Sequence, residues 1–205
     1  MILYLSSYKF GNDTQYLKDW INKNNNKILL IFNALDAKGE EKIKNNISID
    51  TKLLTEIGFE VKVVDLKDYF GKAEQLKNEF SKYNTYCVMG GNVFVLRQAM
   101  NLSGFDKYLK EISSNDNYLY IGYSAGSCVL SKDLLPLATV DEPICFYNKS
   151  KVIYEGIGLT DYLIVPHYKS DYHKSYLIDE LVLKCEKENI KFKTINDGDV
   201  KIIWK

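Results

Sequence analysis

The sequence predicts an α/β fold, a three-layer αβα sandwich built around a mostly parallel sheet. Short apolar runs alternate with amphipathic helical stretches up to the segment Ser127–Ser131, which is typical of strands joined by crossover helices. Some runs are apolar throughout, such as Ile28-Leu29-Leu30-Ile31-Phe32. A continuous apolar run indicates a strand that helices cover on both faces, as in parallel sheets.

The individual elements follow from apolar periodicity and from turn residues between the runs. Predicted strands are Ile2–Ser6, Lys27–Phe32, Glu60–Leu66, Thr85–Met89 and Tyr118–Gly122. Predicted helices are Asp13–Asn22, Lys38–Ile57, Lys72–Ser81, Val93–Met100, Phe105–Ser113 and the short Ser127–Ser131. Gly58 is expected to end the second helix, since glycine adopts the left-handed conformation that often follows a helix.

Beyond Ser131 the pattern loosens around Pro136 and Pro143. The remaining predictions are short strands near Lys151–Tyr154 and at Tyr162–Val165, a helix at Tyr172–Glu188, and a hairpin of Lys191–Ile195 with Val200–Trp204. The hairpin prediction rests on the turn dipeptide Asp-Gly in Asn196-Asp197-Gly198. The 205 residues show no repeat and no linker, so one domain is expected.

Composition argues against several classes of function. The 27 basic and 27 acidic residues give no net charge, so no nucleic acid or anionic membrane partner is expected. Four cysteines without paired spacing and two histidines are too few for a convincing metal site, and neither a metal nor a cofactor is expected. The sequence lacks a signal peptide and any membrane-spanning apolar stretch, which predicts a cytoplasmic protein.

The segment Gly122-Tyr123-Ser124-Ala125-Gly126 stands between a predicted strand and a predicted helix. A Gly-x-Ser-x-Gly pattern in that place is the nucleophile elbow, in which a strained serine exposes its hydroxyl group. The dipole of the following helix would favour negative charge developing near the serine. An ordinary Gly/Ser turn would share the pattern, but the flanking strand and helix favour Ser124 as a nucleophile.

A serine hydroxyl needs a neighbouring base, and histidine is the side chain that titrates near neutral pH. His167 follows a predicted strand and Pro166, at the strand end where ligands bind in open parallel sheets. It is preferred to His173, which lies beside a Lys-rich amphipathic helix and reads as a solvated residue. A structural histidine at a strand end is the alternative interpretation.

A third group must hold the imidazole in the correct tautomer. Asp197 is the first candidate because it follows a predicted strand; Asp199 is the second, and Glu142 or Asp161 are further alternatives. The alternative for each of these carboxylates is that it simply forms a turn. The expected oxyanion hole is the backbone N–H of Ala125 together with that of Gly91, in the loop Gly90-Gly91-Asn92.

Three segments in order resemble the peptidase E family, aspartyl dipeptidase-like serine peptidases related to cyanophycinase. They are Val88-Met89-Gly90-Gly91-Asn92-Val93-Phe94 with Leu96, Tyr120-Ile121-Gly122-Tyr123-Ser124-Ala125-Gly126, and Leu163-Ile164-Val165-Pro166-His167-Tyr168. The resemblance spans essentially the whole chain and implies one peptidase E-like catalytic domain, residues 1–205. It also implies a flavodoxin-like fold similar to class I glutamine amidotransferases, with Ser124 as nucleophile, His167 as base, and Gly91 and Ala125 at the oxyanion.

The order of these residues, serine before histidine before acid, differs from the order in α/β-hydrolases, where histidine comes last. Neighbours of the site residues, namely Asn92, Tyr123 and Tyr168, are expected to contact substrate.

The family is expected to bind aspartate through an arginine downstream of the histidine. This chain has no arginine after Arg97, and only Lys169 or Lys174 could substitute, without bidentate geometry.

The leading hypothesis is therefore a cytoplasmic serine peptidase, dipeptidase-like, that cleaves small peptides through an acyl-enzyme. An esterase or amidase acting on a non-peptide substrate would use the same residues. A catalytically silent protein that binds a peptide or metabolite in the same pocket is a third interpretation, suggested by the missing arginine. The sequence is compatible with either a monomer or a homodimer.

Overall fold

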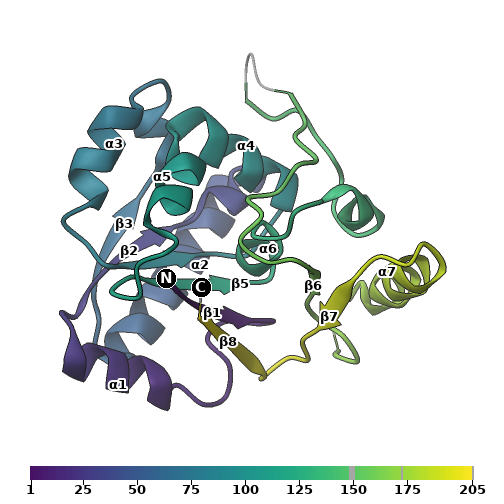
Figure 1. The fold of residues 1–205 in the computed structure, drawn as a ribbon, viewed down its shortest axis with the longest axis horizontal. Helices are drawn as coiled ribbons and strands as arrows, with labels where there is room; N and C mark the ends of the chain where they lie inside the picture. Colours follow the sequence, from purple (N-terminus) through teal and green to yellow (C-terminus); the bar gives the residue numbers. More distant parts are fainter. Residues whose placement is uncertain (148–150, 172, 205) are drawn as a thin grey trace.

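A six-stranded sheet forms the centre of the molecule, in the order β3-β2-β4-β5-β1-β8 (Figure 1). The structure, a computed structural model, describes residues 1–147, 151–171 and 173–204. The strands of this sheet are β1 (Ile2–Ser6), β2 (Lys27–Ile31), β3 (Glu60–Val64), β4 (Thr85–Val88), β5 (Leu119–Tyr123) and β8 (Val200–Trp204). Strands β1 to β5 pair in parallel, and β8 pairs antiparallel with β1.

Helices cover both faces of this sheet, which confirms the predicted α/β sandwich (Figure 1). They are α1 (Gln15–Lys23), α2 (Glu40–Ile57), α3 (Ala73–Phe80), α4 (Val93–Ser103), α5 (Phe105–Ile112), α6 (Ala125–Cys128) and α7 (Ser175–Lys187). Shorter 3₁₀ turns are η1 (Asn33–Leu35), η2 (Leu66–Tyr69) and η3 (Leu135–Thr139). Most boundaries lie within two or three residues of the sequence-based expectation.

Successive residues of each central strand enter two different hydrophobic cores. Leu3 of β1 and Leu29 of β2 pack with α3, α4 and α5, whereas Tyr4 and Leu30 pack with α1 and α2. Side chains of a strand alternate between faces, so a strand buried on both sides must be apolar throughout. This explains the uninterrupted apolar runs in the sequence.

The predicted C-terminal hairpin is wrong. The turn itself exists, with the N–H of Asp199 donating to the carbonyl of Asn196 at 3.0 Å. The strands on either side belong to different sheets, because β7 (Phe192–Thr194) pairs in parallel with β6 (Leu163–Val165) and β8 pairs with β1. A local turn signal predicts the bend in the chain but not which strands pair. Strand β8 pairs with β1, and this pairing supplies the backbone hydrogen bonds that hold β8 at the edge of the sheet.

Two other expectations need correction. Residues 151–154 do not form a strand; Glu155 makes only an isolated bridge with Asp133. The short helix predicted at Ser127–Ser131 begins earlier, directly after Ser124, because Ser124 is its N-cap. The predicted helix start at Tyr172 lies outside the described residues, and α7 begins at Ser175.

The chain gathers several loops at the carboxyl end of the sheet, where open parallel sheets bind ligands. The small sheet of β6 and β7 lies beyond the ends of β1 and β5, on the side of the molecule that also holds α7 (Figure 1).

Within the described part of the chain, no helix is both long enough and apolar enough to cross a bilayer.

Candidate active site

Ser124 occupies a strained turn between β5 and α6. Its backbone has φ 49° and ψ −119°, a region that residues other than glycine seldom adopt and that costs on the order of 1–3 kcal/mol. The turn is fixed to β1, since the N–H of Ser124 donates to the carbonyl of Ser6 at 3.3 Å. The hydroxyl of Ser127 donates to the carbonyls of Gly122 and Ser6, at 2.7 and 3.0 Å.

The two glycines of the Gly-x-Ser-x-Gly pattern allow the turn to pack against the sheet. A Cβ atom at Gly126 would lie 2.1 Å from the carbonyl oxygen of Val88, and one at Gly122 would lie 2.6 Å from that of Gly126. Neither backbone oxygen can move without disrupting β4 or α6. The spacing of the motif is therefore a steric requirement of this close approach.

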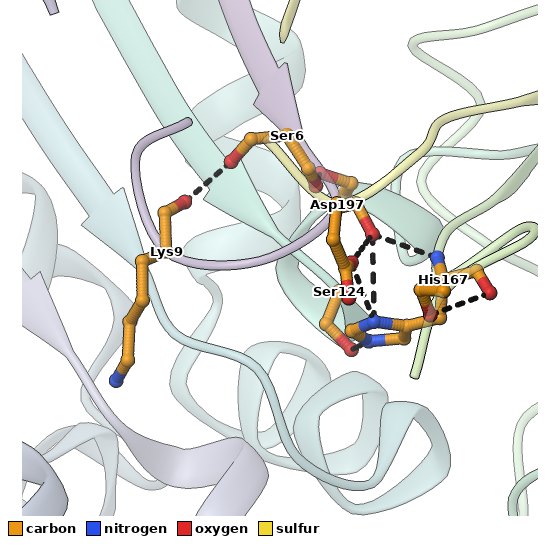
Figure 2. A network of polar contacts seen from close by, with 8 residues as sticks. Ser6, Lys9, Ser124, His167 and Asp197 are labelled. Atoms are coloured by element: carbon orange, nitrogen blue, oxygen red, sulfur yellow. Dashed lines mark hydrogen bonds and ion pairs between the residues drawn. The ribbon is translucent and has the colours of Figure 1, made fainter. Parts of the chain in front are cut away.

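His167 contacts the hydroxyl of Ser124 from the loop that follows β6. Its Nε2 lies 3.1 Å from Ser124 Oγ, and the residue is only 7% exposed (Figure 2). The backbone of His167 has φ 60°, so this residue lies in a left-handed turn directly after Pro166. His173, the other histidine, lines the cleft that opens over Ser124 and His167.

Asp197 contacts the far side of the His167 ring. Oδ1 of Asp197 lies 2.9 Å from His167 Nδ1, and Asp197 comes from the turn that separates β7 from β8 (Figure 2). An ionised carboxylate only accepts hydrogen bonds, so Nδ1 carries the proton and Nε2 is left to accept from Ser124. Among the alternatives, Asp161 is paired with Lys191 at the surface and Glu142 lines the cleft.

Ser7, which sequence reasoning missed, connects Asp197 to the backbone of His167. Its hydroxyl donates to Asp197 Oδ1 at 2.5 Å and accepts the N–H of His167 at 2.7 Å. Ser7 is fully buried and follows the last residue of β1. The signal for it was available: polar residues directly after a parallel strand lie at the ligand-binding edge.

The surroundings keep His167 uncharged. Burial lowers the pKa of the His167 imidazole below its usual value, and this effect outweighs the charge of Asp197, which raises the pKa. The charge of His173 lowers it further. A neutral imidazole is the form that can accept a proton.

The backbone groups proposed for the oxyanion lie beside Ser124. Ala125 is the first residue of α6, so its N–H has no acceptor within the helix. Gly91 follows β4 with φ 152°, and a Cβ there would lie 2.2 Å from the carbonyl oxygen of Ala34. Both residues line a cavity together with Ser124 and His167.

A cleft of about 760 Å³ opens over the three residues Ser124, His167 and Asp197. Asn92 lines it, although its side chain also caps α4 by accepting the N–H groups of Phe94 and Val95. Tyr123 lines it with a buried ring whose hydroxyl donates to the buried Asp50 at 2.6 Å. The described lining does not include Tyr168, whose half-buried ring packs on the core.

The charged side chains of the cleft have both signs. Lys9, Lys38 and Lys174 line it, as do Asp141, Glu142 and Asp171. Lys174 donates to the carbonyl of Val140 at 3.2 Å, and the Lys169 ammonium lies 5.2 Å from the centre of the Tyr168 ring. Arg97 is buried elsewhere, bound to Asp106 and to the carbonyl of Glu155, and is not part of the cleft.

Comparison with known proteins gives the family. Residues 2–199 match the family model of Peptidase family S51. The chain belongs to peptidase family S51. This agrees with the resemblance to peptidase E found in the three sequence segments.

Two relatives of this chain come from Listeria. The chain is 28% identical over 135 residues to "Uncharacterized peptidase Lmo0363" of Listeria monocytogenes, an alignment that covers 65% of this chain and 63% of that protein. It is 29% identical over 137 residues to "Uncharacterized peptidase Lin0382" of Listeria innocua, covering 65% and 62%. The matched region thus spans slightly less than two thirds of each relative's length.

Solved structures share the fold of this S51 chain. A Listeria monocytogenes EGD-e protein described as a peptidase E superposes with a TM-score of 0.76 and 22% identity, covering all of this chain and 98% of that one. A peptidase from an acI-B1 Actinobacterium superposes with a TM-score of 0.69 and 16% identity, covering 98% and 82%. At these identities the likeness concerns the fold alone.

Proposed function

We propose that this S51 chain is a serine peptidase that hydrolyses short peptides, dipeptides included, through an acyl-enzyme on Ser124. The observation that carries the proposal is the continuous contact from Ser124 Oγ through the His167 ring to Asp197, with distances of 3.1 and 2.9 Å. A serine in a strained turn beside a neutral, oriented imidazole is the arrangement that activates a hydroxyl group.

In the first half-reaction, Ser124 Oγ attacks the peptide carbonyl carbon while His167 Nε2 takes the hydroxyl proton. Asp197 holds Nδ1–H and stabilises the imidazolium that forms. The N–H groups of Gly91 and Ala125 stabilise the oxyanion of the tetrahedral intermediate. The C–N bond then breaks, and the proton on Nε2 passes to the departing amine.

In the second half-reaction, water attacks the acyl-enzyme and gives its proton to His167. The ester bond breaks, Ser124 recovers the proton, and the acid product leaves. These steps use only groups of the chain and water. The cleft volume suits a small ligand, and its charges of both signs suit the two charged ends of a short peptide.

The test combines covalent labelling with a peptide panel. Wild type, Ser124→Ala and His167→Ala are incubated with a fluorophosphonate and analysed by intact-mass spectrometry. We expect one adduct on wild type and none on either variant. The matched controls are Ser48→Ala, an exposed serine on α2, and His173→Ala, and both should still be labelled.

The outcomes separate the competing functions. Hydrolysis of dipeptides by wild type, lost in Ser124→Ala, supports the peptidase. Labelling with turnover of esters but no peptides would favour an esterase or amidase. A folded wild type that is never labelled, yet gains thermal stability from peptides, would falsify the enzymatic proposal in favour of a binding protein.

A further inference from the structure

A segment without regular secondary structure forms one wall of the cleft. We name residues 141–147 the wall segment; it contains neither helix nor strand. Asp141, Glu142 and Ile144 line the cleft, and Asp141 also lines the cavity that contains the proposed oxyanion groups. The wall segment therefore faces both the reacting atoms and the space that a peptide would occupy.

The first part of the wall segment is bound to the N-terminus of α4. The side chain of Asn92, the N-cap of this helix, donates to the carbonyl of Glu142 at 2.9 Å. The N–H of Val93 donates to Oδ2 of Asp141 at 2.9 Å. Because Asn92 directly follows Gly91, these bonds connect the wall segment to the loop that holds one of the two oxyanion donors.

The middle of the wall segment is bound to the side chain of Gln98. Its Nε2 donates to the carbonyl of Ile144 at 2.7 Å, and its Oε1 accepts the N–H of Phe146 at 3.1 Å. A residue in a parallel sheet bonds in the same way to two alternate residues of its neighbouring strand. The amide of Gln98 thus supplies, from a helix, the hydrogen bonds that a partner strand would give to an extended segment.

Gln98 is a polar residue among apolar ones. It is fully buried in α4, next to Phe94, Val95 and Ale99, which are buried as well. A buried amide lowers stability unless it is hydrogen-bonded. Packing in the core requires only an apolar side chain of similar length, so the bonds to the wall segment explain why this position holds glutamine.

We propose that Gln98 is a positioning residue for substrate binding, because its amide holds the wall segment where a bound peptide requires it. This inference rests on the proposed peptidase function. Gln98 is absent from the described lining of the cleft, so it would act through Glu142 and Ile144. A wall segment that is in place for only part of the time weakens the apparent affinity in proportion to that fraction.

The first test replaces the amide by an apolar side chain of the same length, in Gln98→Met. We expect KM for the dipeptide that wild type cleaves fastest to rise about tenfold, with kcat and the rate of fluorophosphonate labelling nearly unchanged. Gln75→Met, an exposed glutamine on α3, is the matched control and should leave KM unchanged. An unchanged KM in Gln98→Met, or a loss confined to kcat, would overturn the proposal.

A second pair of variants tests the same contact from the wall segment and leaves α4 intact. Phe146→Pro removes the N–H that Gln98 accepts, whereas Phe146→Ala removes the side chain and keeps this N–H. Phe146 is 40% exposed, so neither change opens a cavity in the core. We expect KM to rise in Phe146→Pro and to stay near wild type in Phe146→Ala. Equal KM values in the two variants would contradict the role of Gln98.

Hydrogen–deuterium exchange separates failure of this proposal from failure of the catalytic one. The backbone amides of residues 141–147 should exchange about tenfold faster in Gln98→Met than in wild type. If wild type is labelled at Ser124 and active, but neither exchange nor KM changes in the variant, the catalytic proposal stands and the role of Gln98 is wrong. If wild type is neither labelled nor active, the catalytic proposal is wrong, and the role of Gln98 in substrate binding falls with it.

Discussion

The backbone N–H of His167 donates to the hydroxyl of Ser7 at 2.7 Å, and the same hydroxyl donates to Asp197. One buried serine after β1 thus holds both the residue that contacts Ser124 and the carboxylate behind it. This hydrogen bond also offsets part of the conformational strain of His167, whose φ of 60° is unfavourable for a residue with a side chain.

Ser7→Ala should lower kcat by roughly 10–100-fold and leave KM nearly unchanged. The variant loses a donor to Asp197 and leaves a buried N–H on His167 without its acceptor, a defect that typically costs about 1–3 kcal/mol. Steady-state kinetics and the rate of fluorophosphonate labelling measure the effect, with Ser48→Ala as control. If the labelling rate does not change, Ser7 is only a packing residue.

Asp197→Asn should lower kcat by roughly 10³–10⁴-fold, because an amide cannot enforce the tautomer with the proton on Nδ1. Substrate binding should persist, because asparagine has nearly the size of aspartate and the other residues that line the cleft are unaltered. Asp161→Asn removes a carboxylate that pairs with Lys191 at the surface and is the matched control. Near wild-type turnover in Asp197→Asn would assign the orienting role to another group.

The acid limb of the pH profile of kcat/KM should lie below pH 6.5, the usual pKa of histidine. Burial of His167 lowers its pKa, so the imidazole loses its proton at a lower pH and remains a base there. In Asp197→Asn the limb should move further down, because Asp197 raises the pKa of His167. An apparent pKa above 7 in wild type would contradict this.

Gly91→Ala should lower kcat by roughly 10²–10³-fold, the usual effect of losing one oxyanion donor. The new Cβ would lie 2.2 Å from the carbonyl oxygen of Ala34, so the loop and its N–H must shift. Gly39→Ala is the control, since a Cβ there meets nothing within 4 Å. Equal turnover in the two variants would remove Gly91 from the mechanism.

Tyr123→Phe should lower the free energy of unfolding by about 1.5–3 kcal/mol, the usual range for a hydrogen bond to a charged group. The lost bond joins the Tyr123 hydroxyl to Asp50, a fully buried carboxylate that also pairs with Lys9. Urea unfolding measures the change, with the exposed Tyr176→Phe as control. A loss below about 0.5 kcal/mol would show that Lys9 alone satisfies Asp50.

Much of this fold could be predicted because its signals are local. The apolar run Ile28–Phe32 and the helical spacing of Leu17 and Trp20 arise from residues that are neighbours in sequence. The elbow around Ser124 is equally local, since Gly122 and Gly126 are required by contacts within the turn and with β4.

Contacts between distant segments could not be predicted. The Asp-Gly turn indicated a bend after Thr194, but no local pattern reveals that β7 pairs with β6 and β8 with β1. The position of Ser7 at the end of β1 had a local signal, but its contact with His167, 160 residues away, had none. Asp197 was placed in a turn from its neighbours, whereas its contact with His167 depends on that distant pairing.

Because β8 lies at the edge of the main sheet, the site can lose its geometry when only part of the molecule opens. An edge strand such as β8 is held by one neighbour, here β1, and edge elements open at a lower free energy than central ones. Asp197 lies in the turn that leads into β8, and Ser7 directly follows β1, so release of β8 would separate the groups that orient His167. Ser124 would stay folded between β5 and α6. We therefore expect heat or denaturant to inactivate this protein while most of the molecule is still native, before its two cores unfold.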